Sequence, residues 1–153
     1  MPSNTRPLVV VADPDVRYAA MMACELRLAG YDTLAAAGGT ETIELVDERR
    51  PDALVLEVAV RGMTGYELCR QIRERPQNRL MPIVMVSPRA GKLDRDFAFT
   101  VGADRYLKKP FPPADIAMAM TQLVPVAAPE PVRPKRRRVY VPVPEPILLG
   151  SYV

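Results

Sequence analysis

The sequence predicts an α/β fold in which helices cover both faces of one parallel sheet. Five short runs of apolar residues alternate with segments that have helical periodicity. The runs are continuously apolar, which is typical of strands buried on both faces. With 153 residues, of which 48 % are hydrophobic, the chain is long enough for one domain with a core and too short for two ordinary ones.

The first half of the chain contains two strand and helix pairs. Residues 8–12 (LVVVA) predict a strand. Residues 14–29 predict a helix with Asp13 as its N-cap and with apolar positions at helical spacing, namely Ala20, Ala23, Cys24 and Leu28. Gly30 ends that helix. Residues 33–37 then predict a second strand, and residues 41–49 a helix whose inward positions are Ile43, Leu45 and Val46.

The second half repeats the alternation three times. Strands are predicted at 53–58, 83–86 and 105–107, and helices at 65–74, 94–101 and 113–124. Five such units joined by right-handed crossovers give a parallel sheet, whose sites form where strand carboxyl ends meet loops. The side chains at or just after those ends are Asp13, Asp15, Glu57, Ser87 and Lys109.

Composition excludes several kinds of chemistry. The chain has no histidine, so catalysis assisted by histidine and metal sites built on imidazole are ruled out. Cys24 and Cys69 are far apart without a CxxC spacing, and we expect buried, reduced thiols in a cytoplasmic protein. No apolar run approaches the ~20 residues of a membrane span, and the first residues lack the apolar segment of a signal peptide.

Charge and proline divide the chain near Val124. Residues 125–153 carry five basic and two acidic residues, so this tail accounts for the whole net charge of +3. The tail also has many prolines, as in PVAAPEPVRP, which is typical of an extended linker. We therefore expect an N-terminal extension (1–6), a folded domain (7–124) and a Pro-rich basic tail (125–153).

Three segments of the folded part carry a family resemblance: PDALVLEVAVRGMTGYELCRQIR (51–73), MPIVMVS (81–87) and GADRYLKKPF (102–111). In this order and spacing they resemble the receiver domain of bacterial two-component response regulators. The resemblance implies a flavodoxin-like (βα)5 sheet with strand order 2-1-3-4-5. It also implies transfer of a phosphoryl group from a kinase histidine to an aspartate at the end of the third strand, with Mg²⁺ held by acidic residues.

The match to the family's site is mixed. Ser87 and Lys109 match the residues that bind phosphoryl oxygens, and Tyr106 matches the switch aromatic. Glu57, however, stands where the family has its phosphoacceptor aspartate. The acids after the first strand are also depleted, since Ala12 precedes Asp13 and only Asp13 is placed to bind a cation. Arg61 adds a positive charge where the family usually has proline.

These differences predict a pocket that does not carry out phosphoryl transfer. Glutamate is one methylene longer than aspartate, and a shift of about an ångström can cost on the order of 100-fold in the rate of phosphoryl transfer. Mg²⁺ also needs near-octahedral oxygen ligands that this pocket does not supply in full, so we expect no cofactor. We interpret Glu57 as a fixed negative charge paired with Lys109. Two alternatives are a solvated Glu57 without a signalling role and phosphorylation of the glutamate itself.

The other site residues also have structural alternatives. Asp13 is either a cation ligand or only a helix cap. Ser87 either faces the pocket or bonds the loop before Pro88. Tyr106 is either a partner contact or an ordinary half-buried strand residue.

The tail offers a second set of contacts. Its basic run contains Arg136, Arg137 and Arg138, and such runs bind phosphates of nucleic acid or lipid, although a solvated linker is their commonest meaning. The tail is too short and too rich in proline for a DNA-reading domain. The apolar cluster Ile147, Leu148 and Leu149 is suited to docking on a partner surface.

The sequence therefore predicts a stand-alone, atypical receiver that is not an enzyme and acts as a phosphorylation-independent protein-interaction module. Its expected partners are a histidine kinase or another regulatory protein, and a second copy of the chain is an alternative. One rival hypothesis is a receiver competent for phosphorelay. The other is a nucleic-acid- or membrane-associated factor that uses the tail.

Overall fold

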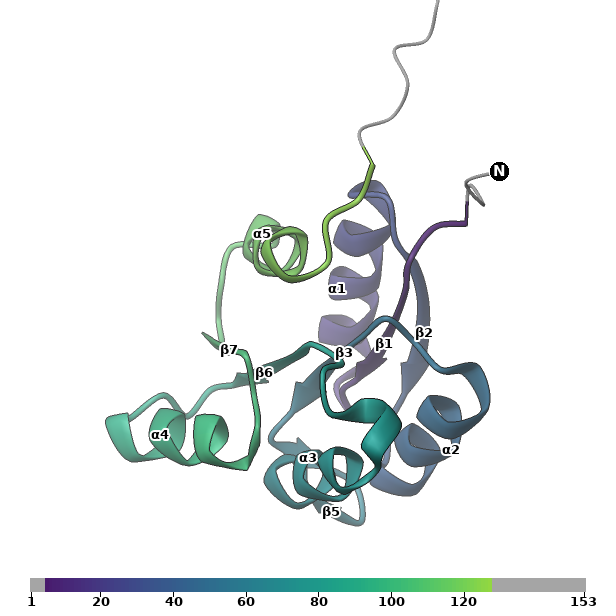
Figure 1. Cartoon of the computed structure of the whole chain (residues 1–153). Helices are drawn as coiled ribbons and strands as arrows, with labels where there is room; N and C mark the ends of the chain where they lie inside the picture. Colours follow the sequence, from purple (N-terminus) through teal and green to yellow (C-terminus); the bar gives the residue numbers. More distant parts are fainter. Residues whose placement is uncertain (1–4, 128–153) are drawn as a thin grey trace, which may run out of the picture.

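The computed structural model describes residues 5–127, which form a five-stranded parallel sheet with a helix after each strand (Figure 1). The sheet order is β2-β1-β3-β6-β7, so the predicted order is confirmed. In chain order the elements are β1 (Leu8–Ala12), α1 (Val16–Leu28), β2 (Asp32–Ala36), α2 (Gly39–Arg49), β3 (Ala53–Glu57), β4 (Ala59–Val60), β5 (Met63–Thr64), α3 (Gly65–Glu74), η1 (Pro76–Asn78), β6 (Ile83–Ser87), α4 (Lys92–Val101), β7 (Arg105–Lys108) and α5 (Ala114–Leu123).

The sheet has a separate apolar core on each face. Because side chains alternate along a strand, Val9 and Val11 of β1 point into the core beneath α1 and α5, whereas Val10 and Ala12 join the core beneath α2, α3 and α4. Figure 1 shows this division of the helices between the two faces. The central strands β1, β3 and β6 are almost wholly buried, which explains their continuously apolar sequences.

The predicted elements agree closely with the structure, except that the short elements β4, β5 and η1 were not predicted. Helix α3 has the predicted bounds, and the main strands differ from prediction by one residue at most at each end. The sequence did not indicate the two-residue strands β4 and β5, which pair as an antiparallel hairpin directly after β3. Gly62 forms the turn of this hairpin with a φ of 85°, a conformation that glycine adopts readily.

Of the four apolar positions predicted for the helical pattern of α1, only Ala23 is buried. The buried residues are Ala19, Met22, Ala23 and Leu26, whereas Ala20 and Cys24 are exposed and Leu28 is 78 % exposed. Apolar residues lie almost all around this helix, so their spacing alone does not fix which side faces the sheet. The expectation of two buried thiols therefore holds for Cys69 only.

Asp15, and not Asp13, is the N-cap of α1. The Oδ1 atom of Asp15 accepts hydrogen bonds from the backbone N–H of Arg17 at 2.9 Å and of Tyr18 at 3.4 Å. The helix begins two residues later than predicted, which leaves the carboxylate of Asp13 available for the pocket described below.

Arg73 ties together the loops at the edge where the strands begin. Its guanidinium donates to the carbonyls of Asn78 (2.7 Å), Met81 (2.5 Å) and Gly102 (2.7 Å). It also forms an ion pair of 3.0 Å with Asp104, whose carboxylate in turn accepts from the N–H of Ile83. One largely buried side chain thus joins the end of α3, the start of β6 and the turn after α4.

The last described residues pack against the same edge. The carbonyl of Val124 accepts a hydrogen bond from the hydroxyl of Tyr31, and Val126 lies against Gly30. Both valines pack on the core beneath α1 and α5. Within residues 5–127, no helix combines the length and apolarity needed to cross a bilayer.

Candidate functional site

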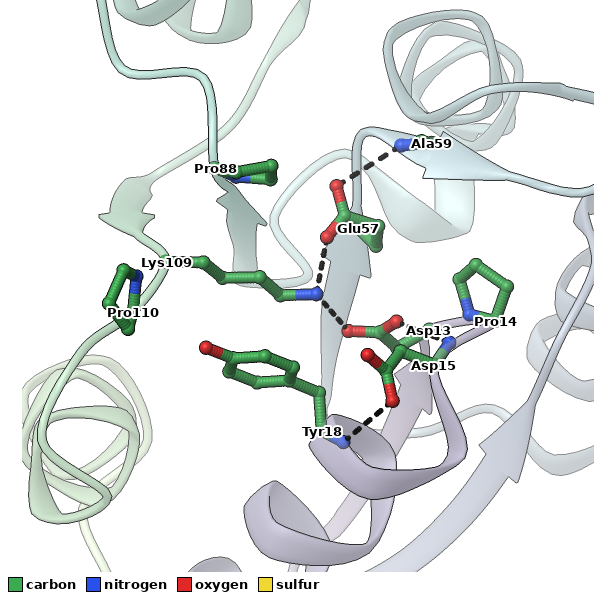
Figure 2. A pocket seen from close by; sticks show the side chains of 9 residues that line it. All are labelled: Asp13, Pro14, Asp15, Tyr18, Glu57, Ala59, Pro88, Lys109 and Pro110. Carbon is green, nitrogen blue, oxygen red and sulfur yellow. Dashed lines mark hydrogen bonds and ion pairs between the residues drawn. The ribbon is translucent and has the colours of Figure 1, made fainter.

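A pocket lies where β1, β3 and β7 end, as expected for a parallel sheet of this order. Its lining comes from the end of β3, from the loops that follow β1, β3, β6 and β7, and from the first turn of α1, and Figure 2 shows the side chains. They are Asp13, Pro14, Asp15, Tyr18, Glu57, Ala59, Pro88, Lys109 and Pro110.

Lys109 is the centre of the pocket. Its Nζ atom lies 2.5 Å from Oε2 of Glu57 and 2.7 Å from Oδ2 of Asp13 (Figure 2). The predicted contact between Glu57 and Lys109 is therefore present, and a second carboxylate shares it. All three side chains are nearly buried, with side-chain exposures of 9 % for Lys109, 5 % for Glu57 and 0 % for Asp13. The alternative of a solvated Glu57 is wrong, because its residue exposure is 4 %.

The surroundings keep Lys109 protonated. Burial by itself lowers the pKa of the ammonium group, but the hydrogen bonds and negative charges of Asp13 and Glu57 outweigh it and raise the pKa above its ordinary value. Burying a lone charge is costly, whereas two hydrogen-bonded carboxylates compensate this one.

The backbone holds Glu57 at the end of β3. Its second oxygen, Oε1, accepts from the N–H of Ala59 at 3.2 Å. Gly65 then passes so close that a Cβ atom there would lie 2.5 Å from the carbonyl oxygen of Glu57. Glycine at position 65 therefore allows α3 to begin directly against the backbone at the end of β3.

The first turn of α1 supplies the other wall. Asp13 uses Oδ1 to accept from the N–H of Asp15 at 2.8 Å, so both of its oxygens have partners. The ring of Tyr18 lies with its centroid 4.2 Å from Nζ of Lys109, a cation–π contact. Tyr18 also packs on Phe111, with ring centroids 6.0 Å apart. The sequence prediction missed Tyr18; the signal was its place three residues after the true cap, Asp15.

Ser87 and Tyr106 make contacts apart from the ammonium group. The Oγ of Ser87, buried at the end of β6, accepts from the N–H of Arg89 at 3.1 Å. The hydroxyl of Tyr106 donates to the carbonyl of Arg89. Both side chains thus bond the loop between β6 and α4, and no hydrogen bond joins either to Lys109 within the described residues.

Arg61 lies outside the pocket lining, and the tail candidates fall outside the described residues. Arg61 is exposed in the turn of the β4–β5 hairpin, and its charge makes no ion pair with Glu57. The predicted tail contacts all fall outside the described residues; they are Arg136, Arg137, Arg138, Ile147, Leu148 and Leu149.

Comparison with known proteins identifies the family. The family model of the response regulator receiver domain matches residues 9–121. The chain belongs to the response regulator receiver family. A protein assigned as a response regulator in Chloroflexus aurantiacus J-10-fl is 31 % identical, with a TM-score of 0.74; the match covers 78 % of this chain and 98 % of that one.

Other solved receivers are similar. The chemotaxis response regulator CheY4 of Vibrio cholerae is 27 % identical, with a TM-score of 0.75 and coverage of 78 % of this chain and 100 % of that one. The receiver domain of a signal transduction histidine kinase from Syntrophus aciditrophicus shares the fold, with 24 % identity, a TM-score of 0.70 and coverage of 76 % and 89 %. Receivers of two-component systems are signalling modules that interact with histidine kinases and other regulatory proteins.

The pocket of this receiver does not fit the Mg²⁺ ion that the family implies. Asp13 has both oxygens engaged, Glu57 contacts Lys109 and Ala59, and Asp15 caps α1. Within residues 5–127 no three carboxylate or thiol side chains are grouped as metal ligands. Because Mg²⁺ requires several oxygen ligands in near-octahedral geometry, an ion here would have to displace the ammonium group of Lys109.

Proposed function

We propose that this receiver is atypical and acts as a phosphorylation-independent protein-interaction module, with Glu57 in place of the phosphoacceptor aspartate. In this proposal Glu57 is a fixed negative charge that holds Lys109 and, through it, the loop after β7. The protein binds its partner in one constant conformation and is not an enzyme. The receiver spans residues 7–124 and is flanked by the extension (1–6) and the tail (125–153).

The observation that carries the proposal is the position of Lys109 between Glu57 and Asp13, at 2.5 Å and 2.7 Å. In related receivers the matching lysine binds a phosphoryl oxygen. In this protein the ammonium group of Lys109 is already paired with the carboxylate of Glu57. An incoming phosphoryl group would bring further negative charge to a pocket whose only buried cation is taken, within the described residues. Such an approach is electrostatically unfavourable.

Phosphoryl donors provide the first test. We expect no mass increase of about one phosphate when the full chain is incubated with acetyl phosphate and Mg²⁺. The extra methylene of Glu57 displaces its carboxylate from the position that an aspartate takes for in-line attack, and the pocket lacks a bridging metal. Intact-mass spectrometry under mild conditions measures this directly. A stoichiometric adduct that disappears in Glu57→Gln would instead establish a receiver competent for phosphorelay.

A matched variant makes the negative result informative. Glu57→Asp restores the family's usual acceptor and keeps the charge. An adduct on this variant alone would show that the extra methylene of Glu57 prevents phosphorylation. A receiver with the usual aspartate, treated in parallel, shows that the donor is active.

Partner binding is the second part of the proposal. We expect Glu57→Gln to alter affinity for the partner more than it alters folding, since Lys109 keeps Asp13 when one charge is removed. The proposed partner is a histidine kinase or another regulatory protein, with Tyr106 and the tail cluster of Ile147, Leu148 and Leu149 as additional contacts. A pull-down that compares the full chain with a chain ending at Val124 measures the share of the tail.

A further inference from the structure

A second cavity lies beside the pocket, and the proposed function does not use it. Its walls come from the end of β3, the β4–β5 hairpin, the first turn of α3 and the loop between β6 and α4. Glu57, Ala59 and Pro88 line both cavities, and Figure 2 shows Ala59 on the side of Glu57 that faces away from Asp13. The second cavity has a volume of about 440 Å³, which lies in the range of small-molecule sites. We call it the hairpin groove.

The walls of the hairpin groove are mainly apolar. Val58 and Met63 line it on the side of the hairpin, Tyr66 on the side of α3 and Pro88 on the side of the β6–α4 loop. The ring of Tyr66 packs edge-on against Phe97, with ring centroids 4.8 Å apart, and this contact fixes the orientation of the ring. An aromatic ring and a methionine thioether both pack favourably on a flat ring. The walls therefore suit a planar, apolar group.

The loop between β6 and α4 supplies the polar end of the groove. The backbone of Arg89 is held on both sides, because its N–H donates to Oγ of Ser87 at 3.1 Å and its carbonyl accepts from the hydroxyl of Tyr106. Its side chain, in contrast, is exposed and forms no hydrogen bond or ion pair within residues 5–127. The hydroxyl proton of Ser87 also has no acceptor among these residues. Two hydrogen-bond donors, one of them a cation, are therefore available at one end of the groove.

The acids around the groove leave the charge of Arg89 available. Within residues 5–127, Glu57 is the only acidic side chain of the lining, and its oxygens are bonded to Lys109 at 2.5 Å and to the N–H of Ala59 at 3.2 Å. Asp94, at the start of α4, is not part of the lining and accepts from a backbone N–H of its own capping turn at 3.1 Å. A ligand carboxylate is a suitable partner for Arg89, because its two oxygens match the planar fork of a guanidinium group.

We propose that the hairpin groove binds a small aromatic carboxylate. The carboxylate accepts hydrogen bonds from Arg89 and Ser87, and the ring packs between Tyr66 and Pro88. A peptide fits the groove less well, because its backbone N–H and C=O groups would be buried against largely apolar walls. The proposal is separate from the proposed function, since none of the four side chains that contact the ligand is bonded to Lys109.

Titration of the full chain with cinnamate tests the proposal. The ¹H–¹⁵N correlation spectrum shows saturable shifts at the amides of Met63, Tyr66 and Arg89, whereas the amides of Asp15 and Tyr18, which line only the other pocket, do not shift. Cinnamamide keeps the ring without the charge and binds at least about tenfold more weakly, the equivalent of one charge-assisted hydrogen bond. Octanoate keeps the charge without the ring, and it also binds more weakly than cinnamate.

Matched variants locate the ligand. Arg89→Gln weakens cinnamate binding at least about tenfold and changes cinnamamide binding by less than about twofold. Arg61→Gln and Lys92→Gln remove exposed cations that do not line the groove, and both leave cinnamate binding within about twofold because exposed charges at a distance are screened. Tyr66→Leu weakens the binding of both probes about fivefold, and thermal melts confirm that each variant is folded. The proposal is overturned by absent saturation, by shifts confined to the other pocket, or by equal losses in Arg89→Gln and the two controls.

Discussion

Replacement of Lys109 by methionine is expected to lower the free energy of unfolding by about 3–5 kcal/mol, the range measured when one partner of a buried ion pair is removed. Methionine preserves most of the aliphatic volume but leaves Asp13 and Glu57 facing each other without a cation. Both carboxylates are nearly buried, with exposures of 3 % and 4 %. Urea unfolding at pH 7, followed by circular dichroism, measures the loss.

Glu57→Gln is the informative comparison for this variant. It removes one charge but leaves Lys109 its 2.7 Å contact with Asp13. The expected loss is therefore smaller, about 1.5–3 kcal/mol, the scale of one charge-assisted hydrogen bond. Equal losses in Lys109→Met and Glu57→Gln, or a loss below 1 kcal/mol in the former, would contradict the shared-cation arrangement.

The stabilisation by Lys109 should also depend on pH in a defined direction. The pKa of Lys109 is raised in the folded protein, so the unfolded chain loses this proton first as the pH increases. The stabilisation is complete below about pH 10, near the ordinary lysine value, and disappears as the pH rises through the folded value. The stability gap between the natural chain and Lys109→Met should accordingly be constant from pH 7 to 9 and narrow above pH 10.

Arg73→Met is expected to be the second large loss, about 3–5 kcal/mol, because it removes the donor of several carbonyls at once. The change removes the hydrogen-bond donor of the carbonyls of Asn78, Met81 and Gly102. It also leaves Asp104 without its ion pair. An unpaired buried acceptor costs about 1–3 kcal/mol, so several together account for the range. Thermal unfolding measures the effect, and hydrogen exchange should show faster opening of the loops that precede β6 and β7.

Arg70 supplies a control on the same helix. It pairs with Glu67 and Glu74 on the exposed face of α3, where such pairs contribute about 0–1 kcal/mol. Arg70→Met should therefore leave the stability almost unchanged. Similar losses at positions 70 and 73 would show that Arg73 stabilises the helix only through its charge and not through the carbonyls.

The sequence was sufficient for the strands because each strand is buried on both faces. Continuously apolar runs bounded by polar residues located β1, β3 and β6 almost to the residue. The strand order, however, came from the family resemblance, because apolar runs do not encode which strands are neighbours. The β4–β5 hairpin was missed since two-residue strands have no periodicity to detect.

Helix α1 was predictable in extent but not in orientation. Its sequence, VRYAAMMACELRL, has apolar residues on nearly every side, and the sheet selects Met22 and Leu26 while Cys24 and Leu28 remain exposed. Propensity also could not choose between Asp13 and Asp15 as the cap, as either aspartate can begin a helix near Pro14. Tertiary contacts determine which aspartate is the cap, because the carboxylate of Asp13 forms an ion pair with Lys109.

The candidate site was predictable wherever strand ends define it. Glu57 is the last residue of β3, and Asp13 and Lys109 directly follow β1 and β7. Parallel topology brings the three together. Tyr18 was not predictable in the same way, because its position depends on the exact start of α1. A shift of the cap by two residues turns a helical side chain by about 200°, which moves it to the opposite side of the helix.

Beryllofluoride, which mimics a phosphoryl group, tests most directly whether the pocket is locked. The measurement is a ¹H–¹⁵N correlation spectrum of the full chain with and without beryllofluoride and Mg²⁺, read at the amides of Ala59 and Arg89, which donate to Glu57 and Ser87. A locked pocket predicts that neither amide shifts, while Glu57→Asp gives saturable shifts at both. Saturable, stoichiometric shifts in the natural chain would contradict a receiver that works without phosphorylation.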